Sequence, residues 1–277
     1  SEQFSFKETN PSKEKLLEVR SVSVNYRSHE RGVFSKGKSV EAVSNVSLDI
    51  RKGERLGLVG ESGCGKSTLT RTILGLQSAS SGSIKFYGQE VSKYANSFKK
   101  YIQVVFQDPY GSFNPRQKIG RLITEPFFTL GREAPPETEQ RIIAQKMLKE
   151  VGLSSESIEK YIHEFSGGQR QRIAIARALV IKPKLIIFDE AVSALDVSIR
   201  SQILKLIADL TERYGLSYLF ISHDLTVIEN ITENCLVMKN GKIVERGQTK
   251  HILRDPKNEY TLSLINAAPK FPNFLHA

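Results

Sequence analysis

The segment GESGCGKST at residues 60–68 has the residue types and spacing of a phosphate-binding loop. It fits the pattern G-x-x-x-x-G-K-[ST], follows a short apolar run and precedes a helical pattern. In such a loop the glycines let backbone N–H groups turn toward an anion, and the positive end of the helix dipole adds to the attraction. Lys66 would reach the β- and γ-phosphates of a nucleotide, and the Ser67 hydroxyl would bind Mg²⁺. The residues expected around the phosphates are Gly60, Glu61, Ser62, Gly63, Cys64, Gly65, Lys66, Ser67 and Thr68.

Two carboxylates, Asp189 and Glu190, follow the apolar run LIIF at 185–188. A buried parallel strand delivers such side chains to its carboxyl end, where open α/β sheets bind ligands. Asp189 would hold Mg²⁺ through water, and Glu190 would polarise an attacking water. A strand that simply returns to solvent gives the same pattern. The functional interpretation therefore depends on the phosphate-binding loop in the same chain.

The segment FSGGQR at 165–170 predicts a second helix start that can bind an anion. Ser166 is a favourable N-cap residue, and Gly167 and Gly168 expose further backbone donors before a helical run at 172–180. An ordinary helix start after a loop has the same features, and spacing alone does not separate the two interpretations.

Strands that alternate with helices must position these residues, which indicates an α/β fold with a parallel sheet. Alternating apolar and polar residues predict two half-buried strands, and short apolar runs predict buried ones. From about 114 to 164 helical patterns dominate and indicate a helical insertion, while 27–39 looks like an exposed basic loop. The predicted strands are 16–26, 42–50, 56–59, 185–188, 218–221 and 236–238, and the predicted helices are 69–76, 137–151, 172–180 and 199–214.

The composition is that of an ordinary globular chain, with 277 residues, 39% hydrophobic and 25% charged. The formal charge of +10 permits nucleic acid, an anionic membrane surface or phosphorylated ligands as partners and does not choose among them. Apolar runs are far shorter than the ~20 residues of a membrane-spanning helix, and the first fifteen residues lack an apolar signal core. We therefore expect neither an integral membrane protein nor a secreted one. Cys64 and Cys235 lie too far apart in sequence for a CxxC pair, which fits a reducing cytosol.

Six segments follow one another in the order and rough spacing of ATP-binding cassette (ABC) transporter ATPases: GESGCGKST, FQDPYGSFNPR, FSGGQRQR, LIIFDE, SALD and ISHDL. The resemblance covers about residues 16–265, and the SGGQ segment separates this family from other P-loop proteins. It implies an α/β P-loop NTPase fold with a parallel-sheet core, an antiparallel β subdomain and a helical insertion. The boundaries we expect are a flexible lead at 1–14, a core at 15–107 and 166–250, a helical subdomain at 108–165 and a C-terminal tail at 251–277.

Within this family the chain is similar to the peptide and nickel importer branch. QDPYGSFNPR, HEFSGGQRQR and the tail DPKNEYTLSLI, with Pro256, Tyr260 and Thr261, carry that resemblance. It implies an ATPase that drives uptake of oligopeptides or dipeptides, with nickel or another metal chelate as the alternative solute. One of the two ATPases in such importers often holds an iron–sulfur cluster near its C-terminus. Because this tail has no cysteine, we expect the partner type without a cluster.

The resemblance also implies roles for single residues. Tyr26 would stack on adenine, although an aromatic residue on an edge strand needs no such role. Gln107 would sense Mg²⁺ and the attacking water, and His223 would contact the γ-phosphate. Ser166 and the Gly168 amide of one protomer would meet the γ-phosphate held by Lys66 of another, so that ATP joins two chains. The residues on that second surface are Ser166, Gly167, Gly168, Gln169 and Asp196.

These roles give a catalytic set of Glu190, His223, Gln107 and Lys66, and a Mg²⁺ set of Ser67, Gln107 and Asp189. Two positions depart from the pattern of the branch, because Ala191 and Ile162 each replace a common proline. The loss of proline at 191 removes a rigid φ constraint next to Glu190. Since every expected phosphate, metal and water contact is present, we expect a competent site.

The resemblance implies a peripheral subunit on the cytoplasmic face of the cell membrane. Its partners would be two transmembrane permease subunits, a sister ATPase (or a second copy) and an extracytoplasmic solute-binding protein, without nucleic acid. The charge favours a nucleic-acid-associated ABC ATPase, but such relatives carry long coiled coils or two cassettes, which are not found here. A small-molecule P-loop kinase would need a lid and no SGGQ helix.

Overall fold

The computed structural model describes residues 12–27, 39–91 and 98–267. Most of the predicted flexible lead, nearly all of the basic loop 27–39 and the last ten residues of the tail lie outside these ranges. Within the described ranges, no helix is both long enough and apolar enough to cross a membrane.

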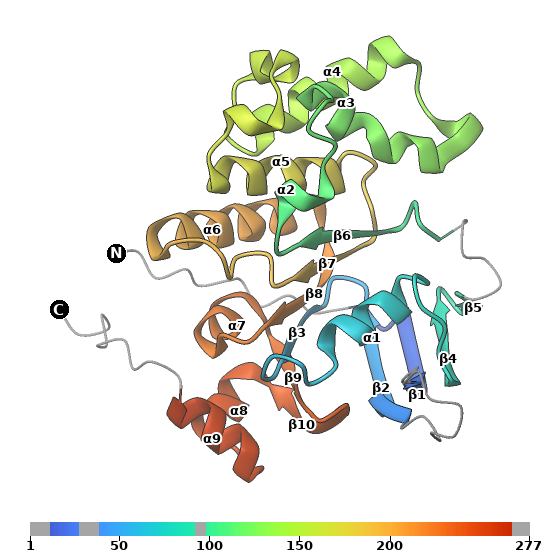
Figure 1. Ribbon diagram of the computed structural model, residues 1–277, viewed down its shortest axis with the longest axis vertical. Helices are drawn as coiled ribbons and strands as arrows, with labels where there is room; N and C mark the ends of the chain where they lie inside the picture. The colour runs from blue at the N-terminus through green and yellow to red at the C-terminus, as the bar shows by residue number, and fades with distance from the viewer. Residues whose placement is uncertain (1–11, 28–38, 92–97, 268–277) are drawn as a thin grey trace, which may run out of the picture.

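A six-stranded sheet in the order β10-β9-β3-β8-β7-β6 forms the centre of the fold (Figure 1). All strands are parallel except β10, which pairs antiparallel with β9. The strands are β3 (Arg55–Val59), β6 (Ile102–Phe106), β7 (Leu185–Asp189), β8 (Ser217–Ser222), β9 (Asn234–Lys239) and β10 (Lys242–Gln248). Strands β3, β7 and β8 are buried throughout, which is why they contain the runs LGLV, LIIF and YLFI without a charged residue.

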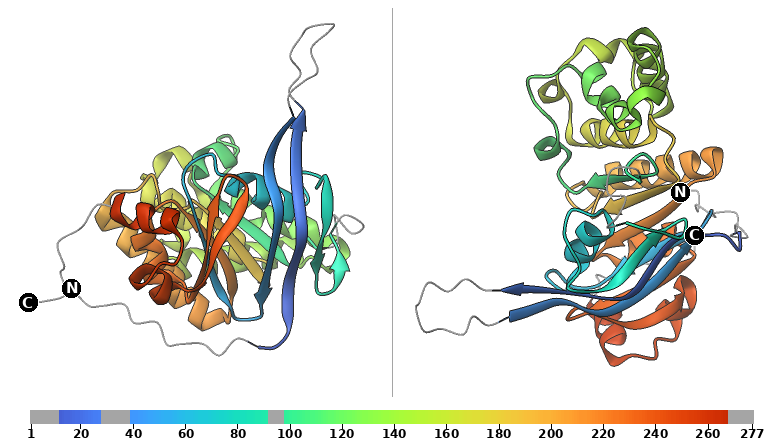
Figure 2. Two further views of the ribbon diagram at one scale, coloured as in Figure 1. Left: turned by 90° about the horizontal axis from the view of Figure 1, so that it is seen from below. Right: turned by 90° about the vertical axis from the view of Figure 1, so that its right-hand side faces the viewer.

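A second, antiparallel sheet has the order β2-β1-β4-β5. It consists of β1 (Lys15–Arg27), β2 (Ser39–Arg51), β4 (Ser81–Phe86) and β5 (Gln89–Glu90). The long β1–β2 ribbon projects beyond the rest of the molecule (Figure 2). Leu17, Val19, Val22 and Val24 are buried along β1 and leave the residues between them more exposed, as the sequence alternation predicted.

Alternate residues of the parallel strands enter two hydrophobic cores. Leu185 and Ile187 of β7 join the core shared with the antiparallel sheet and helix α1 (Lys66–Ile73). Ile186 and Phe188 join the core on the other face, with helices α5 (Gly167–Leu179), α6 (Val197–Tyr214) and α7 (Leu225–Ile231). Helices α8 (Thr249–Arg254) and α9 (Glu259–Ala267) complete the chain beside β9 and β10. The parallel sheet is therefore the middle layer of the fold.

The predicted helical insertion forms the layer at the top of Figure 1. It contains α2 (Pro109–Ser112), α3 (Ile119–Thr124) and α4 (Glu137–Glu150). A 3₁₀ segment (Glu125–Glu133) lies between α3 and α4, and two shorter ones (Ser155–Glu159 and Ile162–Glu164) follow α4. Helix α5 packs on α3 and α4 and also on β6 and α6, so it joins this layer to the sheet. The predicted domain boundaries, among them the one at 165/166 between the helical subdomain and the core, stay predictions.

Candidate functional site

Residues 60–65 of the motif lie between β3 and α1, and residues 66–68 form the first turn of α1, so the motif follows a strand and opens a helix as predicted. Its glycines are required by space and backbone conformation. Gly65 has φ +110°, and a Cβ there would lie 2.3 Å from the Ala42 carbonyl oxygen of β2. A Cβ at Gly60 would lie 2.2 Å from the Met238 carbonyl oxygen of β9. The backbone on the outer side of the loop therefore fixes its path, and side chains larger than hydrogen are excluded at both positions.

Lys66 is 4% exposed and points back into the loop. Its Nζ donates to the carbonyl oxygens of Gly60 (2.7 Å) and Glu61 (2.8 Å) and lies 3.9 Å from Glu190 Oε1. An ammonium group has three donors, so phosphate oxygens can take the place of these carbonyls without moving the lysine far. The Cys64 carbonyl accepts the Gly241 N–H at 2.8 Å, and burial raises the pKa of the Cys64 thiol. Cys64 thus supports the loop through its backbone.

Four predicted site residues lie at the carboxyl ends of neighbouring parallel strands. Gly60 follows β3, His223 follows β8, Glu190 follows β7 and Gln107 follows β6. These strands are neighbours in the order β3-β8-β7-β6 and run parallel, so their carboxyl ends lie side by side. The fold thereby brings together residues that lie up to 163 positions apart in the sequence, from Gly60 to His223.

The two carboxylates at the end of β7 differ in their surroundings. Asp189 is only 9% exposed, and burial raises its pKa to about 6; the charge of Glu190 adds to this rise, whereas Lys66 and Arg71 oppose it. Glu190 has a left-handed backbone with φ +51°, an uncommon conformation for a residue with a side chain. Its N–H donates to the Ile221 carbonyl of β8 at 3.0 Å. The turn directs Glu190 toward Lys66 on one side and His223 on the other, whose Nδ1 lies 3.5 Å from Glu190 Oε2.

The oxygen groups at this edge suit Mg²⁺. Asp189 offers a buried carboxylate; burial raises its pKa, and a cation beside it would favour its charged form. Ser67 offers an exposed hydroxyl at the start of α1, and Gln107 an exposed amide. In the described part of the chain, no cluster of three or more His, Cys, Asp or Glu side chains could hold a metal ion alone. Such a mixed, sparse set matches Mg²⁺, which keeps several waters and binds one or two carboxylates together with substrate phosphates.

Tyr26 lies at the end of β1 beside the phosphate loop. It is 41% exposed, and its hydroxyl donates to Gln77 Oε1 at 2.7 Å and lies 3.3 Å from Thr68 Oγ1. One edge of its ring is thus tied to the loop and its helix, while much of the side chain is open to solvent.

The second predicted surface lies elsewhere in the molecule. Ser166 caps α5, accepting the Gln169 N–H at 3.4 Å, and Gln169 Oε1 accepts the Ser166 N–H at 3.0 Å. Asp196 caps α6 and accepts the Ile199 N–H at 2.9 Å. Gly168 is buried against α6, where a Cβ would lie 2.5 Å from Ile199 Cγ2.

These two sets of residues belong to different layers. Helix α1 packs on β1, β2 and β7, whereas α5 packs on α3, α4, α6 and β6. Ser166, Gly167, Gln169 and Asp196 are exposed, while Lys66 and Asp189 are buried. The two sets of residues therefore lie in different layers of the described chain, and their roles stay predictions.

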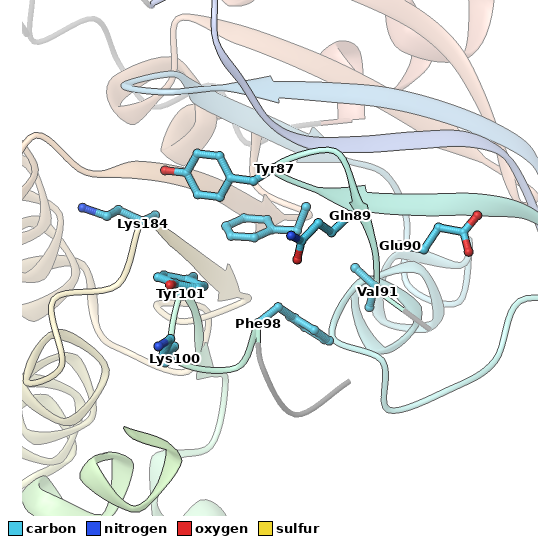
Figure 3. Close-up of a pocket in the computed structure, with 9 residues that line it drawn as sticks. Tyr87, Gln89, Glu90, Val91, Phe98, Lys100, Tyr101 and Lys184 are labelled. Atoms are coloured by element: carbon cyan, nitrogen blue, oxygen red, sulfur yellow. The ribbon is translucent and has the colours of Figure 1, made fainter. Parts of the chain in front are cut away.

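A hollow of about 530 Å³ lies near the amino ends of strands β6 and β7, opposite to the carboxyl ends that carry the predicted site residues (Figure 3). Tyr101 and Lys184 precede β6 and β7, whereas Gln107 and Glu190 follow the same strands. Five residues of a strand span about 17 Å, so this hollow is separate from the phosphate loop. Its lining residues are Phe86, Tyr87, Gln89, Glu90, Val91, Phe98, Lys100, Tyr101 and Lys184.

Comparison with known proteins identifies the family. Residues 43–193 match the family model of ABC transporters, more than half of the chain. The chain belongs to the ABC transporter family. It is 44% identical over 245 residues to the dipeptide transport ATP-binding protein DppF of Escherichia coli (strain K12), covering 87% of this chain and 73% of that protein. It is 45% identical over 267 residues to the oligopeptide transport ATP-binding protein AppF of Bacillus subtilis (strain 168), covering 94% and 80%.

Solved structures of ABC proteins share the fold of this ABC transporter chain. The cbiO1 protein of Clostridium perfringens, part of the ABC transporter complex cbiONQ, aligns with a TM-score of 0.74 and 28% identity over 88% of this chain and 92% of that chain. The dimeric ATP-binding cassette MJ0796, in a post-hydrolysis state bound to ADP and Pi, aligns with a TM-score of 0.74 and 26% identity over 84% and 99%. The predicted family and α/β P-loop fold are confirmed, and the chain is an ATPase of this family.

Two contributions to the site were not found from the sequence. The charge of Arg71, on α1, lowers the pKa of Asp189 against the effect of burial. Tyr260 of α9 contacts the phosphate loop through its hydroxyl. The sequence signal for Tyr260 was its place in the tail of the branch pattern, which says nothing about the distance to a loop 199 positions earlier.

Proposed function

We propose that this ABC transporter ATPase powers the uptake of dipeptides or oligopeptides through membrane-spanning partner subunits. The observation that carries the proposal is its similarity to peptide transporters: relatives named as dipeptide, oligopeptide and di/tripeptide transport ATP-binding proteins are 42–45% identical over 87–94% of the chain. The exposed surface around Ser166 supports an assembly of two ATPases, because the phosphate loop and α5 lie in different layers of one chain.

In this proposal the loop amides and Lys66 bind the β- and γ-phosphates of ATP. Glu190 lies 3.9 Å from the Lys66 ammonium, where it can accept a proton from a water that attacks the γ-phosphate. His223 follows β8 at the same end of the sheet, with its Nδ1 3.5 Å from the other oxygen of Glu190, and would contact the γ-phosphate. Tyr26 offers its exposed ring to adenine.

Mg²⁺ fits the oxygen groups of Asp189, Ser67 and Gln107, and when bound it neutralises charge on the phosphates. The protein contributes the geometry, because Asp189 is fixed by its strand and Ser67 by the first turn of α1. Gln107 stands where β6 leads into α2 and the helical layer, so a change in its position can pass to that layer.

Ser166 and the Gly168 amide would complete the nucleotide site of a second ATPase, as that ATPase completes the site of this chain. The capping box already orders this helix start, so little conformational entropy is lost when a phosphate approaches it. Closure around ATP and separation after hydrolysis would then move the helical layer, which faces the permeases.

The proposed assembly lies at the cytoplasmic face of the cell membrane. It contains two permease subunits, a sister ATPase or a second copy of this chain, and an extracytoplasmic solute-binding protein. The proposed assembly contains no nucleic acid. We attribute the net positive charge of the chain to the binding of nucleotide phosphates and to its solvent-exposed surface.

Uptake by intact cells tests this proposal. Cells without the chain receive either the wild-type chain or Glu190→Gln, and uptake of a radiolabelled dipeptide, a labelled tetrapeptide and ⁶³Ni²⁺ is measured. The proposal predicts that peptide uptake is lost and returns only with the wild-type chain. Loss of nickel uptake with normal peptide uptake would instead establish the metal-chelate alternative.

A further inference from the structure

The C-terminal helix α9 contacts the phosphate loop directly. Tyr260, in its first turn, is 7% exposed, and its hydroxyl accepts the N–H of Glu61 at a distance of 3.2 Å. Figure 1 shows α9 at the end of the molecule formed by α8, β9 and β10. Glu61 is the second residue of the phosphate loop. The last helix of the described chain thus reaches the first turn of the nucleotide-binding loop.

The peptide groups of Glu61 connect Tyr260 to Lys66. The Glu61 carbonyl accepts Lys66 Nζ at 2.8 Å, while the Glu61 N–H is held by the tyrosine hydroxyl. The Gly60 carbonyl, which precedes that N–H in the same peptide group, accepts Lys66 Nζ at 2.7 Å. Because a peptide group is planar, holding the Glu61 N–H also orients the Gly60 carbonyl. Tyr260 therefore constrains one of the two carbonyls that direct the lysine.

Tyr260 is itself held firmly by its neighbours. Its N–H donates to Asn258 Oδ1 at 2.9 Å, and Lys239 Nζ lies 4.5 Å from the centre of its ring. The preceding turn is tied to β10, because the Lys257 and Asn258 amides donate to the Glu245 carboxylate at 2.8 and 3.3 Å. Burial raises the pKa of the Tyr260 hydroxyl, so this group remains protonated at neutral pH. The hydroxyl has a defined position from which it can orient the loop.

We propose that Tyr260 is a positioning residue for nucleotide binding, and that α9 and the phosphate loop are energetically coupled. The inference rests on the proposed role of the loop and of Lys66. Removal of the hydroxyl frees the exposed Glu61 peptide to take other orientations while the ring remains packed. The loop must then lose more conformational freedom when phosphate binds, which weakens binding. Coupling of this kind is reciprocal, so bound nucleotide stabilises the docked α9.

Tyr260→Phe in the full chain tests the proposal. We expect the Kd for ATP and ADP, measured by titration calorimetry with Mg²⁺, to rise by about 3–10-fold, the scale of one hydrogen bond. The KM for ATP rises in parallel, and kcat and Tm stay close to the wild-type values. A change in KM without a change in kcat separates positioning of the loop from a general loss of structure.

Tyr218→Phe is the matched control, because it also removes a buried tyrosine hydroxyl, one that donates to the Ile231 carbonyl. Tyr218 lies near the amino end of β8, away from the loop. This variant should lower Tm and leave the Kd for nucleotide unchanged. Lys66→Ala tests the underlying role of the loop, since normal ATP binding in that variant would reject the role itself rather than the coupling.

Hydrogen exchange tests the reciprocal effect. Saturating ADP should slow exchange of the α9 amides at 259–267 in the wild-type chain and have less effect in Tyr260→Phe. If Tyr260→Phe does not fold, Glu245→Gln loosens the turn before α9 and should also raise the Kd. An unchanged Kd in a folded Tyr260→Phe chain, or in Glu245→Gln as its replacement, overturns the proposal.

Discussion

The phosphate-loop region and the region around Ser166 are built in opposite ways. In the first, Lys66 and Asp189 are buried, and the backbone of β2 and β9 encloses the loop. In the second, Ser166, Gln169 and Asp196 are exposed at the starts of two helices, and their side chains accept hydrogen bonds from backbone amides of their own helix termini. The first region has the form of a binding site, and the second has the form of a surface presented to another molecule.

This difference is what a site shared between two chains would require. The backbone of β2 and β9 encloses the phosphate loop on one side, and among the described helices α5 packs in a different layer from α1. The exposed helix start has backbone donors oriented by its capping box. We infer that catalysis requires the two regions to meet across an interface between chains. The predictions below test each side of this contrast, beginning with the largest effect.

Glu190→Gln should impair ATP hydrolysis in the phosphate-loop region. The amide cannot accept a proton from the attacking water, so ATP turnover should fall by roughly 10²–10⁴, the usual scale for loss of a general base. The Kd for ATP should change little, because Lys66 and the loop amides remain. Glu229→Gln, which changes an exposed carboxylate on α7, serves as the control in the same steady-state assay. Wild-type turnover in Glu190→Gln would remove Glu190 from this role.

Ser166→Asp should prevent the exposed Ser166 surface from meeting the nucleotide of another chain without destabilising the fold. Aspartate is as good an N-cap as serine, so Tm should stay within about 2 °C. Its negative charge would face the γ-phosphate held by the other chain, and turnover should fall by about 10²-fold, as for loss of a transition-state donor. Ser154→Asp at another exposed N-cap is the matched control. Sedimentation with ATP should show that the control pairs and Ser166→Asp does not; equal pairing would refute the role of this surface.

Asp189→Asn should stabilise the chain in the absence of nucleotide and metal. With its pKa raised to about 6, ionised Asp189 destabilises the folded state above that pH. A rise of roughly two units corresponds to about 3 kcal/mol in the free energy of unfolding at pH 7.5. The advantage of asparagine should shrink as pH falls below 6 and disappear below about 3, where aspartate is protonated in both the folded and the unfolded state. Urea unfolding in EDTA at several pH values measures this, and a pH-independent difference would contradict the burial argument.

Gly168→Ala and Gly167→Ala should separate packing from exposure within the second region. A Cβ at Gly168 would approach Ile199 Cγ2 to 2.5 Å, so the isoleucine must shift, and about 1 kcal/mol of stability should be lost. At Gly167 the nearest atom would be Leu195 Cδ2 at 3.9 Å, and alanine should change stability by less than about 0.5 kcal/mol. Equal losses would mean that Gly167 is as closely packed as Gly168.

The buried strands and the phosphate loop could be predicted from the sequence because each has a strong local signal. The first four residues of β7 are apolar, since both faces of the strand are covered, and GESGCGKST matches a specific loop pattern. Helix α1 was predicted at 69–76 but runs from Lys66 to Ile73. Its first residues belong to the loop motif and were assigned to the loop, and Gly75, with φ +66°, follows its end.

Edge strands and long-range contacts could not be predicted in the same way. Strands β6 and β10 lie at the two edges of the large sheet, where residues such as Gln103 and Glu245 are only partly buried. Their sequences therefore lack a continuous apolar run. The contact of Tyr260 with Glu61 depends on how α9 packs beside the sheet, and no local pattern encodes it. The separation of the phosphate loop from the Ser166 surface likewise depends on how the layers pack, which no local sequence pattern encodes.

Mixing two inactive variants of this chain tests the central claim most directly. Lys66→Ala chains keep Ser166, and Ser166→Asp chains keep Lys66, so a mixed dimer contains one intact composite site. We predict that each variant alone turns over ATP at no more than about a hundredth of the wild-type rate. A 1:1 mixture should recover at most about a quarter of that rate, because half of the pairs are mixed and each mixed pair has one of two sites intact. Wild-type turnover by Ser166→Asp alone, at a concentration too low for pairing, would contradict the claim.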